Sequence, residues 1–465
     1  MSVLARLHAA LARPVDGAGL AVFRILFGVL LAVGNLRFLL SGWPQKLYGE
    51  PTFFFRFAGF RHVPPLDVDS ATWAYGGFVV CGVLIALGVL YRPAIVCFTV
   101  LFAWVQLADV TNYLNHYWLV LLLAACLCVL PATSCLALDN LLFRRRQRSV
   151  PRGAYLLLMF QVGVVYVFAA IAKIGPDWLL YGQPLGVWLP GRSELPVIGT
   201  LIAQPIVALL ASWCGFLYDA SIVPLLLWRR SRPFAYVLVV VFHTLTSLFF
   251  SIGMFPVIMA VATTVFFSPS WPRRFFGRWL VAAPSSSTFS SSSSSSSWSK
   301  PATLLLVVWC AVHVALPLRC FVIGDDVLWD EVGMRFSWRV MVREKSGSLS
   351  YKVTLGPLHN HKVVVVNPHD RLTWRQVNEM IGQPDLILQL AHAIRDDLNE
   401  NGYGPVEVRA DSVVTLNGRR SVRFIDPDVD LASVEDCFFC RPGWILPPPT
   451  SPPPDPWRRL RLHRY

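Results

Sequence analysis

The chain has 465 residues, of which 55% are hydrophobic and only 15% are charged, and its mean hydropathy is +0.52. Soluble domains carry about 25% charged residues. The composition therefore excludes an ordinary water-soluble protein and predicts a polytopic membrane protein. The formal net charge of +13 does not indicate nucleic-acid binding, because the basic residues stand in short clusters between apolar segments, where they orient membrane helices.

Ten apolar segments are candidates for membrane crossings, and we expect eight to ten of them to lie in the bilayer. In chain order they lie near residues 17–40, 72–90, 93–110, 113–131, 155–173, 195–212, 214–228, 233–250, 253–267 and 302–318. Proline and glycine interrupt residues 182–205, so the segment 195–212 is equally compatible with a re-entrant or interfacial position. The predicted fold class is mainly α, a helical membrane bundle.

The composition changes after the last apolar segment. The runs "HKVVVVNP", "EVRADSVVTL" and "SVRFIDP" predict strands, and "DLILQLAHAIRDDLN" predicts a helix, which together indicate a small soluble α+β domain. The predicted divisions are a multi-span catalytic domain (1–280), a serine-rich linker (281–301), the last transmembrane helix (302–319), the soluble domain (320–440) and a proline-rich, basic tail without a fixed fold (441–465).

The sequence contains few signs of common site chemistry. No P-loop, GxSxG, HExxH or GxGxxG motif is present, which removes the usual support for nucleotide, hydrolase, zinc-protease and Rossmann functions. Cys437 and Cys440 form one CxxC without a second pair nearby, so they indicate a disulfide or two free thiols, and we expect no metal site. The oligomeric state is left open.

The basic clusters predict the orientation of the bundle. Residues 144–152, 229–232 and 273–278 are the richest in arginine, so these loops should face the cytosol. Counting crossings from them places Asn115, His116, Lys173 and His243 at the opposite face of the membrane, together with the soluble domain.

Each of these polar residues also has a simpler interpretation. Lys173 ends an apolar run and can extend to the interface, and an asparagine–histidine pair at a helix start can be a cap. His243 can be a hydrogen-bonded packing residue, and Arg24 can pair with a carboxylate or a carbonyl. Burying a polar group costs free energy each time, so several at one face indicate a site, in which a buried lysine can act as a general base.

Five stretches of the sequence carry a family resemblance. They are "RPVDGAGLAVFRILFG" (13–28), "AAIAKIGPDWL" (169–179), "FHTLTSLFFSIGMFPVIMA" (242–260), "GMRFSWRVMVREK" (333–345) and "RFIDPDVDL" (423–431). In this order they resemble the vitamin K-dependent γ-glutamyl carboxylase family over most of residues 12–432. The chain is similar to a short family member with the horizontally transferred transmembrane domain.

The resemblance implies a reaction and roles for its residues. Lys173 corresponds to the base that deprotonates reduced vitamin K, the hydroquinone, whose reaction with dioxygen yields the base that activates a peptide glutamate for attack on carbon dioxide. Asn115 and His116 correspond to the pair that stabilises developing charge. The resemblance implies no metal, and its implied substrate- or cofactor-binding residues are Arg24, Asp177, Trp178, His243 and Trp338.

The resemblance also implies partners and a location. These are the lipid bilayer, a secreted peptide or protein containing glutamate, and the endoplasmic reticulum with the C-terminal domain in the lumen. Gly333, Met334 and Tyr113 depart from the animal enzymes, which are considerably longer. The alternatives are a quinone epoxidase that does not carboxylate and a non-enzymatic membrane protein that binds or moves a lipid-soluble quinone.

Overall fold

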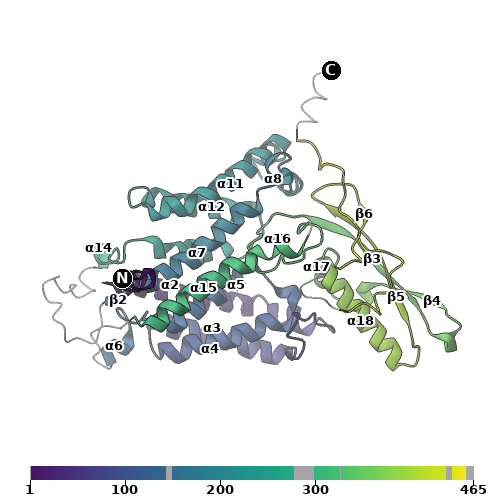
Figure 1. Ribbon diagram of the computed structural model, residues 1–465, viewed down its shortest axis with the longest axis horizontal. Helices are drawn as coiled ribbons and strands as arrows, with labels where there is room; N and C mark the ends of the chain where they lie inside the picture. The colour runs from purple at the N-terminus through teal and green to yellow at the C-terminus, as the bar shows by residue number, and fades with distance from the viewer. Residues whose placement is uncertain (1, 143–148, 277–297, 325, 436–441, 457–465) are drawn as a thin grey trace, which may run out of the picture.

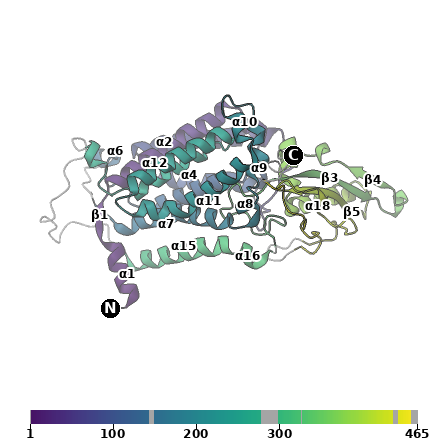
Figure 2. The same ribbon diagram turned by 90° about the horizontal axis from the view of Figure 1, so that it is seen from above.

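The computed structural model describes residues 2–142, 149–276, 298–324, 326–435 and 442–456. A bundle of long helices occupies one part of the molecule, and a smaller domain built on a β-sheet lies beyond one end of this bundle (Figures 1 and 2). This arrangement confirms the predicted fold class of a membrane helical bundle followed by a small soluble α+β domain.

Seven helical segments within the described residues are long and apolar enough to cross a membrane. They are α2 (Ala18–Leu40), α3 (Val68–Leu87), α4 (Tyr91–Ala108), α7 (Arg152–Ala172), α11 (Pro205–Leu227), α12 (Arg232–Phe249) and Lys300–Ile323, which comprises α15 (Lys300–Leu318) and α16 (Cys320–Ile323). Two shorter apolar segments lie among them, α5 (Asn115–Val129) and Phe255–Phe266, which begins with α13 (Phe255–Ala262). The chain is therefore a multi-pass membrane protein.

The candidate crossing at 195–212 is not a separate membrane helix. One helix, α11, runs from Pro205 to Leu227 and replaces the two predicted crossings at 195–212 and 214–228. Proline is well accommodated at the first position of a helix. A backbone N–H at this position would have no partner inside the helix, so the N–H that proline lacks is not missed. The residues that precede α11 form only single turns. The short helices of the bundle are α1 (Val3–Ala12), α6 (Leu138–Leu142), α8 (Pro176–Leu179), α9 (Leu185–Trp188), α10 (Gly199–Ile202) and α14 (Arg273–Phe276).

The segments that adjoin the basic loops gather at one end of the bundle. Strands β1 (Pro14–Asp16) and β2 (Ser149–Pro151) pair antiparallel there, next to an ion pair between Asp16 and Arg273. The soluble domain lies at the opposite end (Figure 1). Polar residues at the far ends of the membrane helices are therefore placed under this domain.

The soluble domain contains a four-stranded antiparallel sheet in the order β4-β3-β5-β6. Its strands are β3 (Lys345–Thr354), β4 (Val363–Val366), β5 (Glu407–Leu416) and β6 (Val422–Arg423), and its helices are α17 (Trp374–Met380) and α18 (Pro384–Glu400). The predicted helix corresponds to α18, whose apolar face is buried in the domain core. Strand β3, which pairs with both β4 and β5, was not predicted because serine and glycine interrupt its apolar pattern.

The structure describes the predicted linker and tail only in part. Most of the serine-rich linker, and both Cys437 and Cys440, lie outside the described residues. The tail prediction is corrected for residues 442–456, which lie against the soluble domain. Trp444 and Ile445 are buried, and the indole N–H of Trp329 donates to the Leu446 carbonyl at 2.7 Å. Apolar side chains between the prolines provide this packing.

Candidate functional site

Lys173 lies at the C-terminal end of α7 and is only 6% exposed. Its ammonium nitrogen Nζ lies 2.8 Å from Asp219 Oδ2 on α11, and it also donates to the Ala169 carbonyl at 3.3 Å. The Trp178 ring lies 5.0 Å from the same nitrogen, within cation–π range. Lys173 therefore does not extend to the interface, as the simpler interpretation would have it, but is buried in an ion pair.

A cavity of about 260 Å³ opens beside this ion pair. Lys173, Asp219 and His243 contribute to its wall, which is otherwise mainly apolar, with residues such as Leu185, Phe249 and Met259. His243 on α12 is 3% exposed, its Nε2 lies 3.3 Å from the Tyr166 hydroxyl, and its Nδ1 has no partner. A buried polar atom without a partner beside a cavity favours a ligand that supplies the missing hydrogen bond.

Asn115 and His116 line a second cavity, of about 540 Å³, rather than the cavity of Lys173. The Tyr113 hydroxyl donates to Asn115 Oδ1 at 3.0 Å and accepts from the backbone N–H of Phe336 at 2.9 Å, which connects this helix start to the segment before the sheet. Both cavities share four wall residues: Ile252, Phe255, Val340 and Met341. The cavities are adjacent, so ligands in them would meet at these residues.

Phe255 contacts both predicted histidines, His116 and His243. Its ring centroid lies 5.9 Å from that of His116 and 5.6 Å from that of His243. The residue belongs to the "SIGMF" turn, which leads into α13. This turn thus brings predicted residues of α5 and α12 into contact with one aromatic ring.

Asp177 does not face either cavity but binds the soluble domain. Its carboxylate accepts from Asn417 at 2.7 Å and from the two terminal nitrogens of Arg419 at 2.6 and 2.5 Å. The neighbouring Trp178 donates its indole N–H to the Ser212 carbonyl at 2.7 Å, which fixes the ring beside Lys173. The motif "PDW" therefore joins the soluble domain, α11 and Lys173 within two residues.

Trp338 is 1% exposed and packs into the core of the membrane bundle. It belongs to the segment that precedes β3, in which Phe336, Trp338 and Met341 have positive φ angles. Such angles persist in bulky residues only where surrounding contacts enforce them. The enforced path carries Val340 and Met341 into the walls of both cavities.

Arg24 lies away from both cavities, so its assignment to the site is corrected. Its guanidinium donates to the carbonyls of Ala132 at 3.1 Å, Ala86 at 2.7 Å and Leu136 at 2.5 Å. It is completely buried at the end of the bundle that adjoins the basic loops. The simpler interpretation, an arginine paired with carbonyls, describes it.

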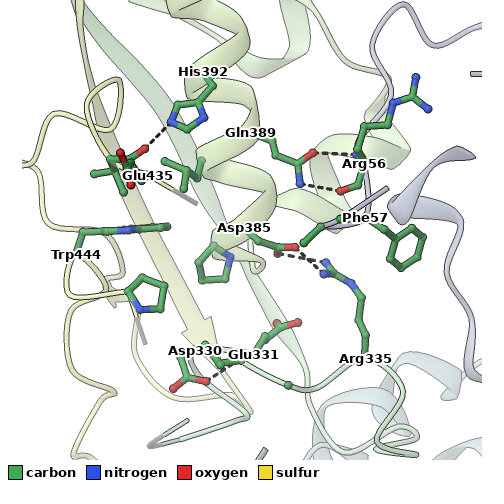
Figure 3. A pocket seen from close by; sticks show the side chains of 18 of the residues that line it. Arg56, Phe57, Asp330, Glu331, Arg335, Asp385, Gln389, His392, Glu435 and Trp444 are labelled. Atoms are coloured by element: carbon green, nitrogen blue, oxygen red, sulfur yellow. Dashed lines mark hydrogen bonds and ion pairs between the residues drawn. The ribbon is translucent and has the colours of Figure 1, made fainter. Parts of the chain in front are cut away.

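A larger cavity of about 960 Å³ lies next to α18, between the soluble domain and the segment 56–61 that connects α2 to α3 (Figure 3). The polar side chains around it are largely paired with one another: Arg335 forms an ion pair with Asp385 at 2.6 Å, and the Gln389 side chain exchanges two hydrogen bonds with the Arg56 backbone. This cavity contains none of the predicted site residues.

Asp219, the partner of Lys173 in the cavity wall, is a site residue that was not predicted from the sequence. It is the sole acidic residue in α11 and is 6% exposed. An ionisable residue inside an apolar span is itself a signal of function or pairing. This signal was available in the sequence, and Lys173 is the partner that explains it.

Two segments of the chain match known families. Residues 12–271 match the family described as HTTM domain, and residues 298–451 match the family described as the lumenal domain of vitamin K-dependent gamma-carboxylase. The boundary between these matches falls between residues 271 and 298, so α15, which begins the last of the seven candidate membrane segments, lies in the second match. No solved structure matches the chain.

Proposed function

Because this chain belongs to the vitamin K-dependent gamma-carboxylase family, we propose that it carboxylates peptide glutamate at the γ-carbon while vitamin K hydroquinone is converted to its epoxide. The observation that carries the proposal is the position of Lys173, whose amine is buried beside an apolar cavity and held by one carboxylate. A general base for a lipid-soluble acid needs this combination of an apolar surrounding and a defined hydrogen-bond partner.

The cavity beside Lys173 suits a prenylated quinone. Its wall is mainly apolar and includes Cys214 and Leu245, which are exposed on α11 and α12, so the cavity reaches the face of the bundle that contacts lipid. An isoprenoid tail could leave between these helices while the ring stays inside. Lys173 and the unpartnered Nδ1 of His243 are the polar atoms that would hold the ring oxygens.

When bound, reduced vitamin K supplies a strong base through its oxygenation. In this proposal the reacting form of Lys173 is the free amine, which accepts the first proton, from a ring hydroxyl, at Nζ. Asp219 orients Nζ and stabilises the resulting ammonium, because an anion 2.8 Å away favours the charged amine. Trp178 and the apolar wall exclude water, which would otherwise quench a strong base.

Asn115 and His116 serve the carboxylation step in this proposal. They line the adjacent cavity, across the shared residues Phe255 and Met341. Their hydrogen-bond donors would stabilise negative charge that develops on the glutamyl side chain when its γ-proton is removed. The peptide would arrive from the side of the soluble domain.

The proposed location is the endoplasmic reticulum, with the soluble domain in the lumen. The described segments that adjoin the basic clusters of the sequence lie at the end of the bundle opposite the lumenal-type domain, which supports this orientation. Secreted glutamyl peptides would then be accessible to the cavities from the lumenal side.

The test uses membranes that contain the protein, reduced vitamin K, dioxygen, labelled bicarbonate and a glutamate-rich peptide. We expect both vitamin K epoxide and labelled γ-carboxyglutamate. Epoxide without carboxylation would leave only the epoxidase alternative, and the absence of both products would refute an enzymatic function with these substrates.

A further inference from the structure

Two hydrogen-bonding atoms in the wall of the Asn115–His116 cavity lack partners. Thr111 and Asn112 line this cavity, and they are only 5% and 7% exposed. Thr111 Oγ1 and Asn112 Nδ2 make no hydrogen bond. Leaving a buried donor unpaired costs about 1–3 kcal/mol, so these two atoms indicate a ligand that accepts hydrogen bonds.

The backbone around these residues is held firmly. They belong to a 3₁₀ turn (Val110–Asn112), in which the Asp109 carboxylate accepts from the Thr111 N–H at 2.9 Å and the Phe55 carbonyl accepts from the Val110 N–H at 2.9 Å. The unpaired atoms therefore belong to a turn that hydrogen bonds already hold in place, and ligand binding would not require this turn to become ordered.

Arg375 on α17 supplies a positive charge at the same place. One guanidinium nitrogen donates to the Thr111 carbonyl at 3.0 Å and another donates to Asn112 Oδ1. Because Arg375 can only donate, the contact identifies the oxygen of the Asn112 amide and leaves its NH₂ group as the unpaired donor. Two donors and a guanidinium thus lie together.

Charged groups of both signs surround this cavity. Arg37, Arg375 and Glu379 line it, and the buried Asp109 carboxylate accepts from the Thr111 N–H beside it. A carboxylate accepts hydrogen bonds only, so it can use both unpaired donors and gains from the adjacent cation. The neutral amide of a glutaminyl side chain would instead place its NH₂ group, a hydrogen-bond donor, against the donors of Thr111 and Asn112, which is unfavourable.

We propose that Thr111, Asn112 and Arg375 form a carboxylate-recognition site, which selects a glutamyl side chain over a glutaminyl one. The inference rests on the proposed function in naming glutamate as the source of the carboxylate. The residues are specificity-determining, and they add a role for the soluble domain, because Arg375 lies on α17 while the other two lie between membrane helices.

The site also fits the positions of the other groups. The cavity it occupies shares Ile252, Phe255, Val340 and Met341 with the cavity of Lys173. A side chain whose carboxylate is held at Thr111 and Asn112 would extend toward Asn115 and His116 in the same cavity. Its γ-carbon would thus approach the wall shared with the proposed quinone cavity.

The test measures binding of two fluorescently labelled peptides, identical except for Glu or Gln, to the purified full chain in detergent. We expect the wild type to bind the Glu peptide at least tenfold more tightly. Thr111→Val should reduce Glu-peptide affinity about tenfold, the loss of one hydrogen bond to a charged group, and Arg375→Gln should remove most of the Glu preference.

A second readout separates recognition from structural damage. Thr111→Val removes an unpaired buried hydroxyl, so its thermal unfolding temperature should be unchanged or higher. The matched control is Thr99→Val, whose hydroxyl donates to the Ile95 carbonyl at 2.7 Å outside the cavity, and it should leave both peptide affinities unchanged.

The two proposals fail separately. Equal binding of Glu and Gln peptides by the wild type, or an unchanged Glu affinity in Thr111→Val, overturns the recognition site whether or not the enzyme turns over. Discrimination that depends on Thr111 and Arg375, in a protein that forms neither epoxide nor γ-carboxyglutamate, supports the recognition site and refutes the proposed reaction.

Discussion

Lys173 Nζ and Asp219 Oδ2 are 2.8 Å apart, and their side chains are 7% and 8% exposed. Removing one member of a buried ion pair leaves an uncompensated charge and costs about 3–5 kcal/mol. We therefore expect Lys173→Met to lower the thermal unfolding temperature clearly. The double variant Lys173→Met/Asp219→Leu should recover most of this loss. If the decrease in unfolding temperature of the double variant equals the sum of the decreases in the two single variants, the two residues do not form a direct pair.

The contact between Asp177 and Arg419 joins the membrane bundle to the soluble domain. Arg419→Gln should lower the free energy of unfolding by about 2–4 kcal/mol, because the Asp177 carboxylate would stay buried with less compensation. Limited proteolysis of the folded chain in detergent should show faster cleavage around β6.

The control for this prediction is Arg409→Gln, which removes an exposed ion pair with Glu407 in the same sheet. Exposed pairs contribute about 0–1 kcal/mol, so the control should resemble the wild type. Equal behaviour of the two variants would argue against a structural role for the Asp177 contact.

Arg24 should matter for stability and not for substrate binding. Arg24→Met leaves several buried carbonyls without a donor, so the free energy of unfolding should fall by about 3 kcal/mol or more. The KM for vitamin K hydroquinone, measured at a temperature where the variant is folded, should not change. A large rise in KM with normal stability would instead return Arg24 to the site.

Lys345 in the soluble domain predicts a pH dependence. Burial lowers the pKa of Lys345 from 10.5 to about 8, although Glu331, 2.9 Å away, opposes the shift. Between pH 8 and 10.5 the unfolded chain holds more protons than the folded chain, so the contribution of this group to stability increases as pH rises through that window.

Unfolding temperatures measured from pH 7.5 to 10 test this prediction. Lys345→Met should remove the part of the stability that increases with pH because of this lysine. Lys352→Met provides the control, because Lys352 pairs with Asp411 at 3.0 Å but its side chain is 55% exposed. If the unfolding temperatures of the wild type and of Lys345→Met change with pH in the same way, burial of Lys345 is not the cause of the pH dependence.

Hydropathy and basic loops predicted much of the bundle, because an apolar span and its flanking charges are local signals. The predicted crossing at 195–212 was wrong because the apolar composition continues through short turns that precede α11 and do not form one continuous helix. The assignment of Arg24 to the site was wrong for a different reason. A charged residue in an apolar span can bind a ligand or donate to backbone carbonyls, and only its neighbours in the fold distinguish the two.

The pairing of site residues could not be predicted from the chain alone. Lys173 and Asp219 are 46 residues apart, and Arg375 lies 263 residues from Asn112. The sequence placed Lys173, Asn115, His116 and His243 at one face of the membrane. It could not divide them between two adjacent cavities, because that division depends on where Phe255 and the segment before β3 pack.

Epoxide formation by the Lys173→Met/Asp219→Leu variant tests the central claim most directly. This variant keeps the fold without the buried charges, so its activity reports on the base rather than on stability. With reduced vitamin K and dioxygen in membranes, we expect epoxide formation at least about 10²-fold below that of the wild type, the usual contribution of a general base. Epoxide formation at the wild-type rate in this variant would contradict Lys173 as the initiating base.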